Sequence, residues 1–364
     1  MKTKTSADRL LFLDWLRGLG AVIMLQGHVF HSFLKPELRS GGPFMMSQFV
    51  GGMPPAIFLF LTGVTLAFLM DSTERKGLAA EARWGAALRR AGYLFLLACA
   101  FRLEMWISGW PKSPGTDLLR VDILNAMGFA VAVLSVMAVF RTAERARLCA
   151  ILGVMIAFAS PWITQIDWSW APALVRSYIV PDYNSFGFFP WAAYLAFGVS
   201  AGSLLRVIPH ESSERLMQWG ALLGGVLILA SQYFANLPFS IYARSEFWLN
   251  SPALVLIKQG VTLLLVSFAF LWTRSMPSGG WSWVRQFGTT SLLVYWVHVE
   301  LVYGRWLWFF KDNLSLAQTL IAVVAVVLLM LAISVAKTRR HRIAAAFANW
   351  GWAFPPRPER VPGD

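Results

Sequence analysis

Apolar runs of about twenty residues recur along this chain, separated by short polar stretches. A run of that length can cross the hydrocarbon core of a bilayer as one helix. The first run lacks a cleavage site of small residues and many runs follow it, so it is not a removable signal peptide. The pattern predicts an all-α, polytopic membrane bundle over residues 1–336. Its roughly ten spanning helices are expected at 10–34, 50–70, 86–108, 120–140, 147–166, 186–206, 216–236, 251–273, 287–309 and 315–336.

The end of the chain, residues 337–364, is basic and aromatic. Its segment "TRRHRIAAAFANWGWAF" has the mixture typical of a helix that lies on a membrane surface. The last stretch, "PPRPERVPGD", has a composition typical of disorder. We expect this tail to be separate from the bundle.

Lysine and arginine are distributed unevenly between the two sets of connecting loops. One set, which includes both termini, holds most of them, among them Arg75, Arg83, Arg145 and Arg206. Because cytoplasmic loops of membrane proteins accumulate basic residues, both termini are predicted to be cytoplasmic. The expected location is a bacterial cytoplasmic (inner) membrane, which the chain crosses many times.

The overall composition agrees with a membrane protein. Hydrophobic residues make up 57% of the chain and charged residues 14%, which is too apolar for a soluble protein of 364 residues. The net charge of +13 follows from the basic cytoplasmic loops and does not require nucleic acid as a partner. Cys99 and Cys149 lie in apolar runs, so we expect neither a disulfide framework nor a metal cluster.

The first predicted helix carries four titratable side chains: Asp14, Arg17, His28 and His31. Charges inside a span cost about 2.5–3.5 kcal/mol each, so they indicate function. Arg17 and His28 are eleven positions apart, which returns them to within about 20° of one face, about 16 Å apart along the axis. Asp14 lies one turn from Arg17, and His31 one turn from His28. The helix therefore presents a polar stripe, with the carboxylate and arginine inside and the histidines outside.

Other spans carry polar side chains at the depth of the two histidines. By the predicted orientation, the outer half also holds Arg102, Glu104, Arg120, Asp122, Lys258, His298, Glu300 and Arg305. His298 and Arg305 share a helix face, whereas Glu300 points elsewhere.

A glycine-proline turn opens the second span on the same side. Pro54 and Pro55 suit the first turn of a helix, and Gly51 and Gly52 permit a close backbone approach. A helix N-terminus there would aim N–H groups at the histidines and stabilise an oxyanion. An ordinary surface turn is the competing interpretation.

These residue types suit acyl transfer across the membrane. A histidine is a natural general base near neutral pH, and a neighbouring group such as Glu300, Asp122 or His31 can orient it. Arg17 can hold a phosphate-bearing donor that arrives from the cytosol. The histidine either takes the acceptor proton or carries the acyl group. Metal chemistry is not expected, because His28 and His31 would supply only two ligands.

Four stretches resemble a known family. "RLLFLDWLRGLGAVIMLQGHVFHSFL", "FVGGMPPAIFLFLTGVTLAF", "LRVDIL" and "TTSLLVYWVHVELVYG" are similar to bacterial membrane proteins of the heparan-alpha-glucosaminide N-acetyltransferase type. The spacing from Arg17 to His28 also resembles sugar O-acyltransferases of acyltransferase family three. The resemblance implies acetyl-CoA or another acyl-CoA as donor and a glycan-like or other small acceptor. It makes His28 the matched catalytic histidine and Arg17 the matched motif arginine.

The candidate site residues fall into three groups. Catalytic candidates are His28, His31, Asp122, His298 and Glu300; donor-binding candidates are Asp14 and Arg17; acceptor-binding candidates are Arg102, Arg120 and Arg305. Two other hypotheses remain open: a proton-coupled secondary transporter that uses the same charges, and a non-catalytic scaffold or sensor. The lipid bilayer is the expected partner, and an oligomer is compatible with the sequence.

Overall fold

The computed structural model describes residues 11–183, 185–276 and 280–349, and within them every regular element is a helix. The α-helices are α1 (Leu11–Phe33), α2 (Gly42–Gly51), α3 (Met53–Arg75), α4 (Ala80–Gly109), α5 (Ile123–Leu134), α6 (Thr142–Gln165), α7 (Ala173–Ile179), α8 (Phe188–Val207), α9 (Ser213–Ala235), α10 (Pro252–Ser275), α11 (Trp283–Thr289), α12 (Ser291–Tyr303) and α13 (Leu316–Asn349). The short 3₁₀ helices are η2 (Pro36–Leu38), η3 (Gly115–Leu119), η4 (Ser135–Val139), η5 (His210–Ser212) and η6 (Trp308–Phe310).

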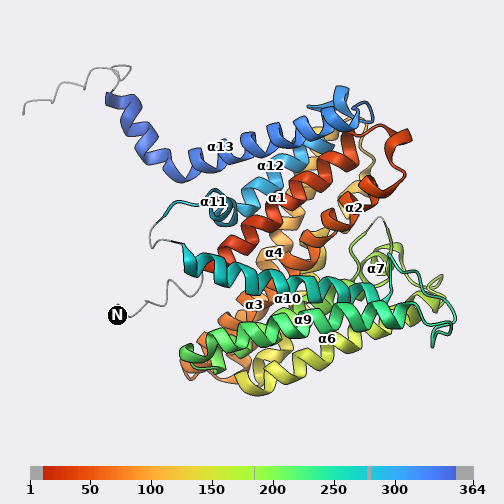
Figure 1. The fold of residues 1–364 in the computed structure, drawn as a ribbon, viewed down its shortest axis with the longest axis vertical. Helices are drawn as coiled ribbons and strands as arrows, with labels where there is room; N and C mark the ends of the chain where they lie inside the picture. The colour runs from red at the N-terminus through yellow and green to blue at the C-terminus, as the bar shows by residue number, and fades with distance from the viewer. Residues whose placement is uncertain (1–10, 184, 277–279, 350–364) are drawn as a thin grey trace, which may run out of the picture.

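The long helices lie roughly alongside one another in Figure 1, with α2 and α7 toward the right of the picture and α11 toward the left. Eight helical segments of the described chain are long and apolar enough to cross a membrane. This confirms the predicted polytopic all-α bundle. They correspond to eight of the ten predicted spans, those other than 10–34 and 287–309.

The two remaining predicted spans differ from the simple pattern. α1 has the length of a span, with 23 residues, but it carries the polar stripe. The predicted span 287–309 is not one helix, because the chain breaks at Thr290 between α11 and α12 and the helix ends at Tyr303. The Thr290 hydroxyl lies 2.5 Å from Ser334 Oγ on α13. Such side-chain hydrogen bonds make a helix break tolerable at membrane depth.

α1 occupies the middle of the bundle. One side of it packs with α3 and α10 in a shared apolar cluster, and the other side packs with α12 and α13. A further cluster joins α3 to α4, α5, α6 and α8. The polar side chains of α1 are therefore directed at neighbouring helices.

Glycines let several helix pairs approach backbone to backbone. A Cβ at Gly198 of α8 would lie 2.0 Å from the carbonyl oxygen of Phe60 on α3. A Cβ at Gly18 of α1 would lie 1.8 Å from the carbonyl oxygen of Val284 on α11. Small residues at helix contacts are typical of membrane bundles, where close packing takes the place of a hydrophobic driving force.

The predicted boundary at residue 336 falls inside α13, which continues to Asn349. Residues 337–349 therefore continue the helix of the last predicted span, and α13 changes direction along its length in Figure 1. The predicted disordered stretch lies outside the described residues.

Candidate functional site

A cavity of about 910 Å³ lies at the end of the bundle where α3 begins and where α1, α4 and α12 end. Its wall includes both histidines of α1 and polar side chains from the other helices. Among the lining residues are His28, His31, Gln48, Arg102, Arg120, Asp122, Tyr295, Glu300, Tyr303 and Arg305. Most of the predicted outer-half residues therefore line one cavity, although they come from distant parts of the chain.

His28 and His298 form a direct pair. His28 Nδ1 lies 2.8 Å from His298 Nε2, and the rings are 5.0 Å apart and nearly parallel. His298 is fully buried, and its Nδ1 lies 2.6 Å from the carbonyl oxygen of Val294. The prediction that these histidines share a depth is correct, and the hydrogen bond between them goes beyond it.

The hydrogen bonds fix the tautomers of the pair. A carbonyl oxygen only accepts, so His298 Nδ1 carries a proton and donates it to Val294. In the neutral ring, His298 Nε2 is then an acceptor, and His28 Nδ1 must donate to it. His28 Nε2 is left with its lone pair, on a side chain that lines the cavity. The pair therefore presents one proton acceptor to whatever occupies the cavity.

Tyr303 of α12 connects the two histidines of α1. Its ring meets the His28 ring edge-on at 5.1 Å, and its hydroxyl lies 3.3 Å from His31 Nδ1. Lys311, in the loop after η6, donates to the Tyr303 carbonyl at 2.6 Å. Burial lowers the pKa of this lysine. His31 is thus held beside His28 by a tyrosine that was not among the predicted site residues.

Asp122 holds Arg102 and caps a helix. Its Oδ1 accepts from the backbone N–H groups of Leu124 and Asn125 at the start of α5. Its Oδ2 accepts from Arg102 Nε and Nη2 at 2.9 and 2.8 Å. Both oxygens are therefore engaged away from His28, and the expectation that Asp122 orients the histidine is not supported by this geometry.

Glu300 also faces away from the histidine pair. It lies against Glu104 of α4, and its Oε1 accepts from Trp306 Nε1 at 3.3 Å. Since Glu300 is two residues from His298, it emerges from another side of α12, as the sequence predicted. His298, rather than a carboxylate, is the partner of His28 in the described structure.

Arg120 and Arg305, two of the predicted acceptor-binding residues, line the cavity. Lys112 lines it as well. These side chains give the cavity positive charge beyond the paired Arg102.

Asp14 and Arg17 lie at the other end of α1, away from the cavity. Arg17 Nη1 lies 2.7 Å from Asp14 Oδ1 in an ion pair. The arginine side chain is 25% exposed and the aspartate side chain 35%. α11 meets α1 here, because a Cβ at Gly288 would lie 1.8 Å from the Asp14 carbonyl oxygen. The polar stripe therefore has two separate ends, with apolar packing between them.

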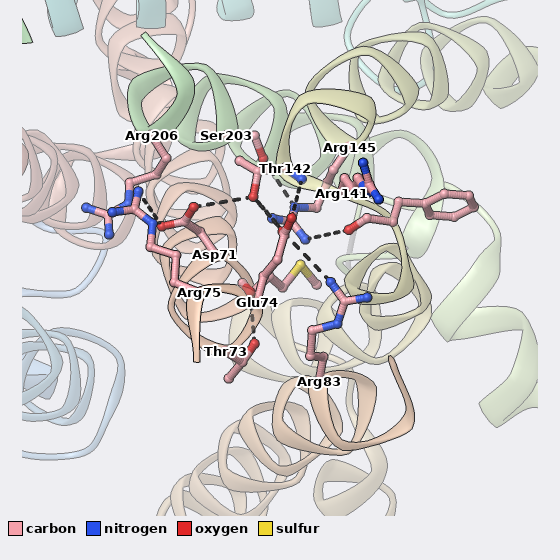
Figure 2. A network of polar contacts seen from close by, with 12 residues as sticks. Asp71, Thr73, Glu74, Arg75, Arg83, Arg141, Thr142, Arg145, Ser203 and Arg206 are labelled. Carbon is pink, nitrogen blue, oxygen red and sulfur yellow. Dashed lines mark hydrogen bonds and ion pairs between the residues drawn. The ribbon is translucent and has the colours of Figure 1, made fainter. Parts of the chain in front are cut away.

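A second polar cluster joins the helix ends opposite the cavity (Figure 2). Asp71 of α3 accepts from Arg206 of α8 at 2.6 Å. Glu74 lies 3.4 Å from Arg145 of α6, and it accepts from the Thr142 hydroxyl at 2.7 Å. Arg145 is fully buried and lies inside α6, so its placement in a loop was wrong. α6 begins at Thr142, five residues before the predicted span, and Arg145 therefore ties three helices together.

The start of α3 is a poor source of hydrogen-bond donors. α2 runs almost directly into α3 through Gly52, and the first turn of α3 contains Pro54 and Pro55. Prolines have no N–H, so the expected ring of free backbone donors is largely missing. The predicted close approach is confirmed, since a Cβ at Gly51 would lie 2.9 Å from Gly27 Cα.

In the described part of the chain, no group of three or more histidine, cysteine or acidic side chains is arranged to hold a metal ion. The site is a cavity inside a helical membrane protein, with His28 in its wall, His298 bonded to His28 behind it, and cationic side chains around it.

Residues 9–242 match the catalytic family of heparan-alpha-glucosaminide N-acetyltransferase, and the chain belongs to this family. Membership implies a membrane acetyltransferase with a donor of the acetyl-CoA type. The match covers α1 to α9 and includes His28, whereas His298 and Tyr303 lie beyond it. No curated protein matches the chain.

Proposed function

We propose that this protein transfers an acetyl or other acyl group from acyl-CoA to a hydroxyl or amine of a glycan-like acceptor, with His28 as the general base. The observation that carries the proposal is the hydrogen bond of 2.8 Å between His28, which lines the cavity, and the buried His298. This hydrogen bond leaves the lone pair of His28 Nε2 directed away from His298. His298 is then a positioning residue, because it acts through His28.

The reaction balances with these groups alone. The acceptor O–H or N–H gives its proton to His28 Nε2 while its heteroatom attacks the thioester carbon. The C–S bond breaks, and the CoA thiolate leaves and recovers the proton from His28. Throughout, His28 Nδ1 donates to His298, which stabilises the positive charge that develops on the ring.

The acceptor side is supported by the lining of the cavity. Aromatic side chains such as Trp106, Trp308 and Tyr183 line the same cavity as Arg120 and Arg305. Aromatic faces with a few fixed polar groups form an orienting site for a small polar ligand. The predicted orientation puts this acceptor outside the cytoplasmic membrane and the acyl donor inside.

The donor side rests on Arg17. Its side chain is a quarter exposed at the end of α1 opposite the cavity, where the guanidinium can meet a phosphate. Arg17 and His28 are separated by about 16 Å along the helix. The long pantetheine arm of CoA is the kind of group that bridges such a separation. Since apolar packing fills this stretch, donor binding requires the helices around α1 to move.

The test is acyl transfer by purified protein in proteoliposomes, with labelled acetyl-CoA and a mixture of saccharide acceptors. We expect label to appear on an acceptor in wild type and acetyl-CoA to raise the unfolding temperature, since a ligand stabilises the state that it binds. If acetyl-CoA neither binds nor donates its acyl group, the proposal fails. If acceptor accumulates inside vesicles without any acyl donor, the proposal fails and transport takes its place.

A further inference from the structure

Acyl transfer through a tetrahedral intermediate needs donors for the oxygen that becomes negative. Backbone N–H groups at the start of α3 are an insufficient source, since Pro54 and Pro55 occupy its first turn. Another donor has to stand close to His28 in the same wall of the cavity.

α2 forms that wall through close contacts with α1. A Cβ at Gly27, the neighbour of His28, would lie 2.8 Å from Gly51 Cα. One turn before Gly51 on α2, Ser47 Oγ accepts a hydrogen bond of 2.7 Å from Gln26 Nε2 of α1. Ser47 and Gly51 are four positions apart and share the face of α2 that meets α1.

Gln48 lies at the edge of this face, three residues before Gly51. It lines the cavity, as do Gly27 and His28. Its Nε2 is buried and has no hydrogen-bond partner among the described residues. A buried donor without a partner is costly, so an amide left in this state beside a ligand cavity points to an acceptor on the ligand.

The cationic side chain of Lys258 lies behind the junction of α2 and α3. Lys258 of α10 is buried, and its Nζ donates to the Gly52 carbonyl at 3.1 Å and lies over the Trp191 ring at 5.4 Å. No ion pair with a carboxylate is recorded for it in the described chain. Gly52 also lines the cavity, so the positive charge lies directly behind the wall.

We propose that the corner between α2 and α3 is the oxyanion subsite, with the Gln48 amide as the donor and Lys258 as a positioning residue whose charge favours the anion. This inference rests on the proposed function. The ligand is the carbonyl oxygen of the acyl thioester. As the acceptor attacks, the π electrons of the carbonyl move onto this oxygen, and they return when the C–S bond breaks. Gln48 donates a hydrogen bond throughout and exchanges no proton.

The test is the single-turnover rate of acyl transfer in Gln48→Met, which keeps the length of the side chain and removes the donor. We expect a loss of about 100- to 1,000-fold, as for other oxyanion donors. Gln48→Glu should be slower still, since a carboxylate repels the oxyanion. The control is Gln259→Met, which alters a buried glutamine of α10 outside the cavity lining and should stay within about threefold of wild type.

The binding of acetyl-CoA, followed by thermal shift, should be kept in Gln48→Met and Gln48→Glu, because the interaction belongs to the transition state. A wild-type rate in either variant would overturn the inference while leaving the proposed function intact. Loss of activity together with loss of acetyl-CoA binding would also overturn it, by making Gln48 a ground-state contact. If wild type itself transfers no acyl group, the proposed function fails first.

Lys258→Met tests the second residue through its effect on Gln48. Lys258→Met should lower the transfer rate by a larger factor in wild type than in Gln48→Met. The reason is that Lys258 and the Gln48 amide act on the same thioester oxygen. Purely additive effects of the two substitutions would show that Lys258 only caps the end of α2.

Discussion

Replacing His298 by leucine removes the acceptor that holds the His28 proton on Nδ1. The perturbation is confined, because His298 is fully buried and its two ring nitrogens face His28 and the Val294 carbonyl. In His298→Leu, the useful tautomer of His28 keeps a buried Nδ1–H without an acceptor. That costs about 1–3 kcal/mol. The other tautomer, which has its proton on Nε2 and cannot accept one, becomes favoured.

The size of the effect follows from that cost. Each 1.36 kcal/mol corresponds to a factor of ten in rate. The chemical step should therefore slow by about fivefold to 150-fold. His298→Gln should recover part of the loss, since its amide oxygen can accept from His28 Nδ1. A merely structural role would show no such recovery.

The assay is single-turnover transfer from labelled acetyl-CoA in proteoliposomes, with acetyl-CoA binding measured in parallel. Binding should be kept in both variants, since His298 does not line the cavity. If His298→Leu transfers at the wild-type rate, the tautomer argument is wrong. Equal losses in His298→Leu and His298→Gln would likewise refute it, because they would point to packing.

Three further predictions concern stability and acceptor binding. Asp122→Asn keeps a good N-cap for α5 but removes the charge that pairs with Arg102. We therefore expect a lower unfolding temperature, and a raised KM for the acceptor with a smaller change in kcat. Arg145→Met should destabilise the protein by about 1–3 kcal/mol, visible in thermal unfolding, because Glu74 and the Phe140 carbonyl lose a buried donor. Gly198→Ala should destabilise the protein by about 1–3 kcal/mol. The control Gly225→Ala, where a Cβ meets open space, should be neutral or stabilising. Identical unfolding temperatures of the two variants would contradict the close helix packing.

The helices could be predicted from the sequence because a span needs about twenty apolar residues and leaves a strong signal. The break between α11 and α12 left no such signal. It rests on one threonine, Thr290, and on its contact with Ser334 of a helix far along the chain. Arg145 was misplaced for a related reason, since a charge at the edge of an apolar run resembles a loop residue until its partners are known.

The charged half of the site could also be anticipated. A titratable side chain inside a membrane is costly, so His28 and His298 were conspicuous, and the predicted orientation put them at one depth. Their direct hydrogen bond depends on how α1 and α12 rotate against each other, which periodicity does not specify. Tyr303 and Gln48 escaped notice because an uncharged polar side chain costs less. Gln48 also lies just before the predicted second span, where it looked like part of a loop.

The most direct test of the central claim is the rate of acyl transfer by His28→Gln, measured beside wild type on protein shown to be folded. Glutamine can still donate a hydrogen bond to His298 but cannot take a proton from the acceptor. We expect transfer to fall by about 100- to 10,000-fold while acetyl-CoA still binds. Transfer at the wild-type rate by His28→Gln would contradict it.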